Sequence, residues 1–446
     1  DEQSDREQLT TAQELKEQYW KRTVGPVRTA LERTLNILDC YGLEMEMGHK
    51  EVGGVKAKMG HSGHYDHIME QLEIDWKYSD ALQAADNEKQ VKYIVRDIFR
   101  LHGLDVTFMA KPMEGVAGSG EHTHLGLAAK LKDGRVVSMF SSKDGKDFLN
   151  VIGYGALMGI LNNYEVINPF ISATNDAFNR LKPGFEAPVC TVTSMGHSVE
   201  APSRNRTVLA GLIREAGNPL ATRFELRSPN PNSNTYLVIA ASYMAMLDGI
   251  RAAVNAGKTP ADLEKSISKK KGEEDFYLET GREYRSEKDV FAHYTPEERD
   301  DIFGKPPETV WDNITAFDKY PEKLEIFKSG GVMTDIVLES YKEAIVNQWA
   351  TELYNRIIPN AMDTVRNCRR LHNESATDYD IGMWAKISAQ RDKIAKNTMN
   401  KFCILKKISD ALDKADYNLA SQLQLEAQRE IRKLIDMYSS YKRNLL

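Results

Sequence analysis

Residues 223–231, which read RFELRSPNP, constrain the fold of this chain more than any other stretch. Charged and apolar residues alternate before the first proline, which is the period of a β-strand. Arg223, Glu225 and Arg227 then share one face of the strand, and two apolar side chains share the other. A carboxylate between two guanidiniums is costly to bury unless a cation or an anion joins them. The stretch therefore predicts either a metal and anion site or an exposed strand whose charges pair with each other.

A glycine-rich stretch before two alternating histidines indicates another part of such a site. Gly115, Gly118 and Gly120 permit the backbone to approach a ligand closely. His122 and His124 follow on what reads as a strand, so both rings are expected on one face. The pattern predicts a metal or phosphate site; the alternative is a glycine hairpin that carries two incidental histidines.

Arginine is concentrated in one span of a chain whose net charge is −6. Because guanidinium groups bind phosphate and carboxylate with two parallel hydrogen bonds, this concentration favours recognition of such an anion. The negative net charge gives no indication of a nucleic-acid partner. The arginines of the span are Arg180, Arg204, Arg206, Arg223 and Arg227.

Three histidines at three-residue steps, His61, His64 and His67, form a separate candidate. They fit either a transition-metal site or a polar loop whose imidazoles are solvated. Four widely spaced cysteines without a CxxC pair indicate reduced thiols, as in a cytoplasmic protein. No apolar run approaches membrane-spanning length, so we expect no membrane partner.

Hydrophobic periodicity predicts an α+β chain in three parts. We expect a helical lead-in over residues 1–36, a large middle domain over 37–355 and a helical region over 356–446. Within the middle domain, the polar segment 258–310 reads as an insertion or flap with a few short helices. The clearest elements of that domain are strands near residues 43–52 and 69–78 and helices near residues 86–103, 146–165 and 234–256.

Five short blocks form one ordered pattern between about residues 35 and 353. They read HKEV at 49–52, EQLEI at 70–74, GSGEHTH at 118–124, RLKPGFEAP at 180–188 with NR at 205–206, and a last block at 223–237. In order they resemble the HHEV, GQNEI, GSGMHVH, KRLxPGYEAP with NRS, and RIExRxPDPxxNPYL blocks of the glutamine synthetase catalytic domain. The inserted segments and the C-terminal helices resemble the type III branch of that family most.

The resemblance implies a fold, a reaction and an assembly. The fold is an antiparallel sheet curved into half a barrel, with helices outside it. The reaction is the ATP-dependent ligation of ammonia to L-glutamate through γ-glutamyl phosphate, which forms glutamine in nitrogen metabolism. Two or more Mg²⁺ or Mn²⁺ ions per site are implied, and so is a cytoplasmic, ring-shaped homo-oligomer with sites between subunits.

The resemblance also implies the ligands of two divalent cations. Glu51, Glu73 and Glu186 would hold one cation, and His122 and Glu225 would hold the other. Carboxylates suit these ions because Mg²⁺ and Mn²⁺ are hard cations that prefer oxygen ligands.

Substrate contacts follow from the same resemblance. Gly118, Arg180 and Arg227 would bind glutamate. Arg206 would stabilise the phosphoryl group during transfer, and Glu186 would accept a proton from ammonium. The residues implied to contact ATP are His49, His124 and Arg223.

The chain departs from the family pattern at several points. Lys50 replaces a histidine, and Ala117 stands where the family often has asparagine. The chain begins without a methionine, and the family's N-terminal domain has no counterpart ahead of residue 35, so we expect the N-terminal part of the site to be missing. The alternatives are a γ-glutamyl–amine ligase that uses a larger amine and a non-catalytic relative kept for assembly or regulation.

Overall fold

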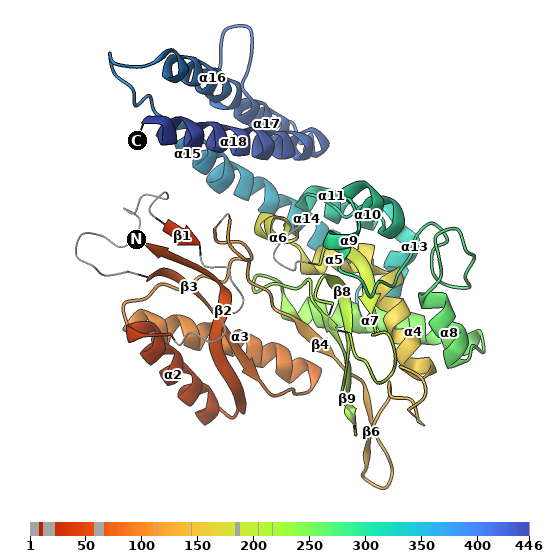
Figure 1. Ribbon diagram of the computed structural model, residues 1–446. Coiled ribbons are helices and arrows are strands. Elements are labelled where there is room, and N and C mark those ends of the chain that lie inside the picture. The colour runs from red at the N-terminus through yellow and green to blue at the C-terminus, as the bar shows by residue number, and fades with distance from the viewer. Residues whose placement is uncertain are drawn as a thin grey trace. The chain divides into compact units, whose positions relative to one another are not determined.

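The computed structural model describes most of the chain as two units (Figure 1). One unit runs to Pro306 and includes Glu322–Gly330; the other holds residues 307–321 and those from 331 onward. The described residues are 9–11, 23–57, 67–113, 115–143, 145–182, 188–203, 205–215 and 217–445.

A three-stranded antiparallel sheet packs against two helices at the start of the first unit. The strands β1 (Leu9–Thr11), β2 (Met45–Ala57) and β3 (His67–Trp76) lie in that order. The apolar stripes of α2 (Gly25–Cys40) and α3 (Ala81–Leu101) form one core with the apolar side chains of β3. The predicted strands near 43–52 and 69–78 and the helix near 86–103 are therefore confirmed.

The helical lead-in predicted for residues 1–36 is wrong at Leu9–Thr11, which form a strand. Leu9 pairs with Ala57 and Thr11 with Val55, at the free edge of β2. Threonine is β-branched and favours such an extended edge, and the partner strand lies too far along the sequence for local periodicity to reveal it. The lead-in helix, α2, begins only at Gly25.

A second, four-stranded sheet carries the part of the candidate site that lies on β4 and β9. Its order is β4 (Thr123–Leu125), β9 (Asn218–Leu226), β8 (Val208–Glu215) and β7 (Cys190–Ser194). Neighbours are antiparallel except β7 and β8, which are parallel, so the antiparallel prediction is wrong for this one pair. The described sheets are open and form no closed barrel. A hairpin adds β5 (Ala128–Lys130) and β6 (Val136–Ser138).

Two apolar helices, α4 (Val151–Asn162) and α7 (Thr235–Asn255), pack with their backbones in close approach. A Cβ at Gly159 would overlap the carbonyl oxygen of Ala245, and a Cβ at Gly249 would overlap that of Gly155. The glycines are therefore required by packing rather than by backbone conformation. After α4 the chain forms α5 (Tyr164–Ile171) and α6 (Asn175–Arg180).

The helix α7 corrects the expectation that no apolar run is long enough to cross a membrane. Among the described residues it is the one helix that passes this test by length and composition. Its most apolar window is 39% buried inside the structure. Since its Val238, Ala241 and Ala245 are buried and α4 lies against it, the packing of a core helix accounts for its composition.

Because α4 and α7 approach closely at Gly159, we expect alanine there to lower stability, whereas alanine at the exposed Gly382 should raise it. Gly159→Ala should lower the free energy of unfolding by about 2 to 3 kcal/mol, because the new methyl group has no room. Gly382→Ala, in an exposed helical position with open space around it, should raise it by about 0.5 to 1 kcal/mol. Urea unfolding followed by circular dichroism measures both, and equal effects would contradict the steric explanation.

Residues 258–306 of the polar segment 258–310 are part of the first unit's framework. The segment contains the predicted short helices, α8 (Pro260–Ile267), α9 (Val290–His293) and α10 (Pro296–Phe303). Its reading as a flap is wrong, because Arg285 pairs with Thr193 at the outer edge of β7. Thr193 N donates to Tyr284 O over 2.8 Å, and Ser286 N donates to Thr193 O over 3.0 Å.

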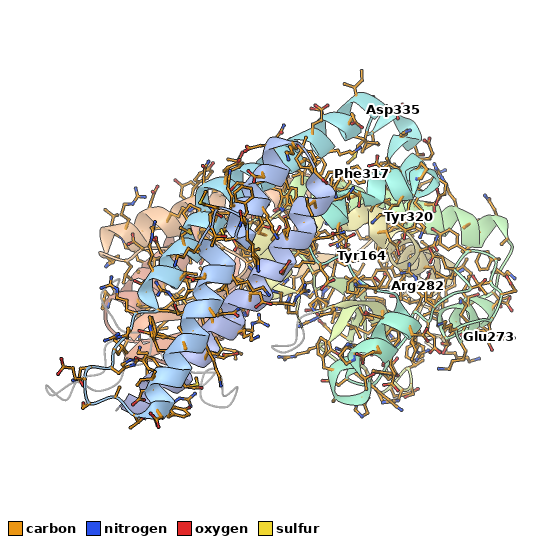
Figure 2. The ribbon with its side chains drawn as sticks, turned by 90° about the horizontal axis from the view of Figure 1, so that it is seen from above. Tyr164, Glu273, Arg282, Phe317, Tyr320 and Asp335 are labelled. Atoms are coloured by element: carbon orange, nitrogen blue, oxygen red, sulfur yellow. The ribbon has the colours of Figure 1, made fainter. Side chains whose placement is uncertain are left out.

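A buried ion-pair network fixes the same segment from its other side. The guanidinium of Arg282, which Figure 2 labels, donates to the carboxylate of Glu165. Lys323 donates to Glu165 over 3.0 Å and also to Glu279. These bonds join three separate parts of the sequence. The segment is therefore held to Glu165 of α5 and to Lys323.

The second unit is helical, which confirms the prediction for residues 356–446. Trp311, Trp349 and Tyr417 pack together in its core. Its long helices α16, α17 and α18 pack against one another. The bounds of its helices are α11 (Val310–Ile314), α12 (Ala316–Lys319), α14 (Asp335–Glu352), α15 (Ile358–Asn367), α16 (Asp378–Ala395), α17 (Ile404–Asp413) and α18 (Tyr417–Leu445); α13 (Pro321–Leu324) lies at the boundary between the units.

Candidate active site

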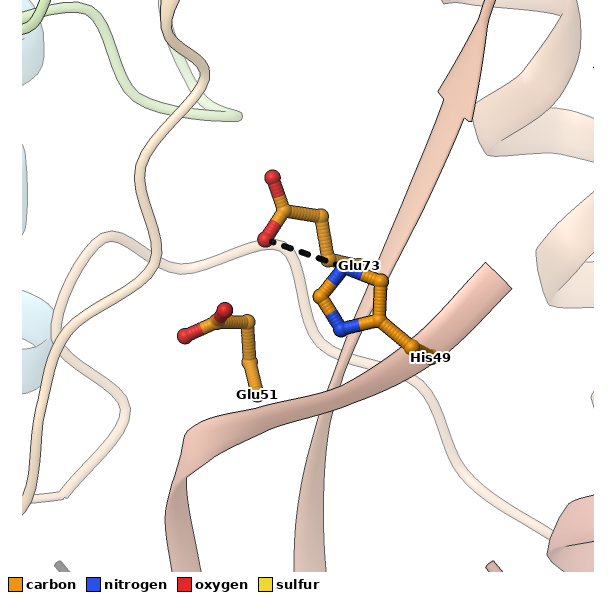
Figure 3. A group of neighbouring side chains, drawn as sticks. All are labelled: His49, Glu51 and Glu73. Atoms are coloured by element: carbon orange, nitrogen blue, oxygen red, sulfur yellow. Dashed lines mark ion pairs between the residues drawn. The ribbon is translucent and has the colours of Figure 1, made fainter. Parts of the chain in front are cut away.

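His49, Glu51 and Glu73 meet on one face of β2 and β3 (Figure 3). The antiparallel register places His49 opposite Glu73, and Glu51 follows two residues later on the same strand. One ligand atom from each residue lies within 4.8 Å of the others. His49 Nε2 is 3.8 Å from Glu73 Oε2 and 3.8 Å from Asp75 Oδ2.

These three residues are close enough together that they could hold a divalent cation. Glu51 Oε1 is buried and has no hydrogen-bond partner among the described residues. A buried carboxylate oxygen without a partner carries a large desolvation cost, which a cation would remove. Two carboxylates and an imidazole therefore fit a metal ion, and His49 joins the ligand atoms although the sequence assigned it to ATP. Glu186, the third carboxylate of that assignment, lies outside the described residues.

Crowding of negative charge makes Glu73 an unusual carboxylate. Burial, followed by the like charges of Asp75 and Glu51, raises the pKa of Glu73 to about 8. Glu225, on the other sheet, contributes in the same direction, so the two sheets share one electrostatic field. Without a cation, Glu73 is therefore largely protonated at neutral pH.

The raised pKa of Glu73 predicts that metal binding is linked to proton release. A cation must displace the Glu73 proton below about pH 8, so Mn²⁺ affinity should rise from about pH 6.5 to about pH 8.5 and level off above that range. Calorimetric titration in two buffers of different ionisation enthalpy measures the protons released. Glu73→Gln should bind more weakly and lose this proton release, whereas unchanged release in that variant would contradict the assignment.

The second sheet brings His122, Glu225 and Arg227 into one hydrogen-bonded row. His122 Nδ1 lies 3.1 Å from Glu225 Oε1, and Arg227 Nη1 donates to the same oxygen over 2.6 Å. Phe224 and Leu226 point into the core, so the alternation predicted before the first proline is confirmed as far as Leu226, where β9 ends. The charges are half-buried or buried, which excludes the alternative of an exposed strand.

The surroundings of Glu225 and His122 lower the pKa of both groups, so the carboxylate is ionised and the imidazole is neutral. Burial alone would raise the pKa of Glu225, but the hydrogen bond from His122 and the charge of Arg227 outweigh it and lower the pKa to about 2. Burial lowers the pKa of His122, although Glu225 partly opposes this. His122 is therefore a neutral imidazole whose Nδ1–H faces Glu225, which leaves the Nε2 lone pair for a cation.

His124 and Arg223 form a second contact across β4 and β9. His124 pairs with Glu225 in the strand register, and its Nδ1 accepts a hydrogen bond from Arg223 Nε over 2.9 Å. Burial lowers the pKa of His124 to about 4, so its ring is a neutral acceptor. Both histidines face side chains of β9, as expected from their alternation.

Gln71, which no sequence motif assigns to the site, joins the first group to the glycine loop. Its Nε2 donates to Gly118 O over 2.9 Å, and its Oε1 accepts from Gly53 N over 2.6 Å. A Cβ at Gly118 would meet Arg180 Cγ at 2.9 Å and overlap the carbonyl oxygen of Ala110. Gly118 is thus required where the loop crosses Arg180. The sequence feature that could have indicated a role for Gln71 is its position two residues before Glu73.

Arg180 is buried, whereas Arg206 is exposed. Arg180 is 8% exposed and donates to the carbonyls of Ser228 and Arg227 over 2.9 and 3.0 Å. Burial, together with the charge of Arg227, lowers the pKa of Arg180 to about 10. Arg206 is exposed, and its carbonyl accepts a hydrogen bond from Arg227 Nε over 3.0 Å.

An acidic pair bridged by lysine is a further feature that the sequence analysis missed. Lys92 lies 3.0 Å from Glu121 and also pairs with Glu88. The hydroxyl of Thr235, the first residue of α7, lies 3.2 Å from Glu88 Oε2 and 3.1 Å from Glu121 Oε1, so its one hydrogen is shared between the two carboxylates. The cluster ties α3 and α7 to the residue before His122. Glu121 stands at the methionine of the family's GSGMHVH block, and this departure was the available signal.

Several sequence candidates cannot be placed. Arg204, His61 and His64 lie outside the described residues, and so does the side chain of His67. The metal site suggested for these three histidines therefore stays a prediction.

Comparison with known proteins identifies the family. A family model described as "Glutamine synthetase, catalytic domain" matches residues 7–281, which is more than half of the 446 residues. Proteins named glutamine synthetase from Clostridium saccharobutylicum, Frankia alni and Thermotoga maritima are 37%, 36% and 33% identical over 52%, 48% and 50% of this chain. The aligned regions span 44%, 40% and 48% of those relatives, so the chain matches less than half of their length. A chain that matches this catalytic domain over so long a range belongs to the glutamine synthetase family.

Proposed function

We propose that residues 37–355 form the catalytic domain of an ATP-dependent ligase that joins ammonia to L-glutamate. The observation that carries this proposal is that two carboxylate–imidazole groups, on separate sheets, interact electrostatically through Glu73 and Glu225. The charge of Glu225 in one group contributes to the raised pKa of Glu73 in the other, which supports a single site. Arginines line the second group, which suits anionic substrates.

The proposed chemistry has two steps. A γ-carboxylate oxygen of glutamate attacks the γ-phosphorus of ATP, and the bond to ADP breaks. Ammonia then attacks the γ-carbon of γ-glutamyl phosphate, and phosphate leaves. In the second step the proton lost from ammonium passes to Glu186, the role implied for this residue by the family's PGYEAP loop.

Two Mg²⁺ or Mn²⁺ ions, when bound, would supply positive charge beside the phosphate oxygens. His49, Glu51 and Glu73 would hold one ion, together with Glu186. His122 and Glu225 would hold the other; the neutral His122 ring and the ionised Glu225 carboxylate are in the right states for ligands.

The arginines orient the anions in this proposal. Arg227 binds a glutamate carboxylate while its other donors fix the site's own backbone. The buried Arg180 supports the same carboxylate subsite and the Gly118 loop above it. Arg223 and His124 face the ATP phosphates, and Arg206 stabilises negative charge on the transferring phosphoryl group.

Further parts of the proposal follow from the family alone. They are a half-barrel arrangement of the sheets, a ring-shaped homo-oligomer with sites between subunits, a cytoplasmic location, and an assembly role for the helical region 356–446.

Ammonium-dependent phosphate release tests the proposed function. The assay contains ATP, glutamate and Mg²⁺ or Mn²⁺, and compares the chain with a form extended upstream. Release that requires both glutamate and ammonium, in either form, is the expected result. No ammonium-dependent release from either folded form would overturn the proposal, and release with a larger amine would instead identify a γ-glutamyl–amine ligase.

A further inference from the structure

The loop between β7 and β8 carries Arg206 and folds back tightly at its start. Gly196 has a φ of 107°, a conformation that L side chains rarely adopt. A Cβ at this position would overlap the carbonyl oxygen of Ala201. The loop therefore begins with a fixed turn, but this turn lies ten positions before Arg206 and cannot by itself fix the arginine.

Glu287, from the polar segment 258–310, binds the beginning of this loop. Its carboxylate accepts hydrogen bonds from Met195 N over 3.1 Å and Gly196 N over 3.0 Å. It also accepts from the Ser194 hydroxyl and from Arg285 Nε, the latter over 2.9 Å. The side chain is only 14% exposed, so four donors replace its hydration.

Asn205, next to Arg206, binds the same segment at the other end of the loop. Its Nδ2 donates to the carbonyl oxygens of Ser286 and Lys288 over 3.2 and 2.8 Å. Its Oδ1 accepts from the Thr207 amide and hydroxyl over 3.0 and 2.7 Å. Both amide hydrogens and both lone pairs of the side chain are thus used, which fixes its orientation.

Arg206 lies between two anchors. On one side its carbonyl accepts a hydrogen bond from Arg227 Nε, and on the other its neighbour Asn205 is bound to Ser286 and Lys288. We propose that residues 285–288 form a clamp that positions Arg206 for phosphoryl transfer, with Glu287 and Asn205 as positioning residues. The role in transfer rests on the proposed function; the clamping of the loop does not.

The clamp acts through hydrogen bonds to the backbone of the loop. Glu287 contacts backbone amides of the loop rather than apolar side chains, so it fixes the path of the chain. Burial alone would raise the pKa of Glu287, but the bonds from Ser194 and Arg285 outweigh it and lower the pKa. The carboxylate therefore stays ionised at neutral pH and keeps all its acceptors.

Asn205→Asp tests the clamp with almost no change in shape. A carboxylate still accepts from Thr207 but cannot donate to Ser286 and Lys288, so it faces two carbonyl oxygens. Glu287→Gln is the second variant, because it removes the charge from the other end of the loop. Glu283→Gln is the matched control: it lies in the same segment and pairs with Lys270, away from the loop.

Two measurements on the whole 446-residue chain are needed. Hydrogen–deuterium exchange of peptides covering residues 195–206 should be about tenfold faster in Asn205→Asp and Glu287→Gln, and unchanged in Glu283→Gln. In the form active in phosphate release, Asn205→Asp should lower kcat about tenfold or more, while KM for glutamate changes less than about threefold.

Each outcome decides the proposal. Unchanged exchange in both variants overturns the clamp. Faster exchange with an unchanged kcat in an active protein overturns its role in positioning Arg206. If the unsubstituted protein releases no phosphate, the proposed function fails, and faster exchange in the two variants alone still supports a clamp on the loop.

Discussion

Glu225→Ala is expected to abolish ammonium-dependent phosphate release while the protein stays folded. Glu225 joins His122 and Arg227, and its carboxylate is ionised throughout the neutral range because its pKa is about 2. Removing it takes away a proposed metal ligand and leaves the guanidinium of Arg227 without its carboxylate. The loss of one preorganised charge at such a centre lowers kcat by about 10²- to 10³-fold, and the loss of a metal ligand adds to that.

The measurement pairs the phosphate-release assay with circular dichroism. Asp133→Ala is a suitable control, because Asp133 lies at the turn between β5 and β6 and its exposed carboxylate pairs only locally with Arg135. The control should keep full activity. Full activity in Glu225→Ala would rule out the metal assignment of Glu225, whatever the fold of the variant.

Arg227→Ala is expected to weaken glutamate binding most. Arg227 is 7% exposed, and its guanidinium donates to Glu225 and to the carbonyl of Arg206, so its remaining donors are oriented before any substrate arrives. Two charge-assisted hydrogen bonds to a carboxylate are worth about 3 kcal/mol or more, which corresponds to a rise of about 10²-fold in KM for glutamate. The variant should also lose about 2 kcal/mol or more of unfolding free energy, because Glu225 loses its buried partner.

Arg227→Lys separates the two effects. Lysine keeps the charge beside Glu225 but lacks the planar fork that also reaches Arg206 O. Most of the unfolding free energy should return, whereas the KM for glutamate should stay high. An unchanged glutamate response in Arg227→Ala would remove Arg227 from the substrate site.

Local patterns predicted those parts of the site whose geometry lies within one strand. The alternation around Glu225 assigned its face and that of Phe224 correctly, because a strand has a fixed period of two residues. The same reasoning placed His122 and His124 on one face. The helix near residues 86–103 was predictable because its apolar stripe is long, and the helix near residues 234–256 because the whole segment is long and apolar.

Contacts that depend on distant partners were not predictable in this way. Gln71 could be read as one more polar residue of a strand, since its role depends on the amide of Gly53 and the carbonyl of Gly118. Leu9–Thr11 form a strand only because β2 offers a free edge. Glu287 lies in a segment whose composition resembles a solvated insertion, and its donors come from the β7 end.

The pairing of Arg285 with Thr193 also has a consequence for biosynthesis. Unpaired strand edges are templates for intermolecular pairing, and here the outer edge of β7 is covered by backbone bonds from residues 284–286. Met195 and Glu287 are separated by 92 positions in the chain. The strands of this sheet are therefore synthesised well before residues 284–287, which cover the edge of β7. Nascent chains in this interval expose a bare edge, and we expect aggregation in cells to depend on how quickly residues 284–287 reach it.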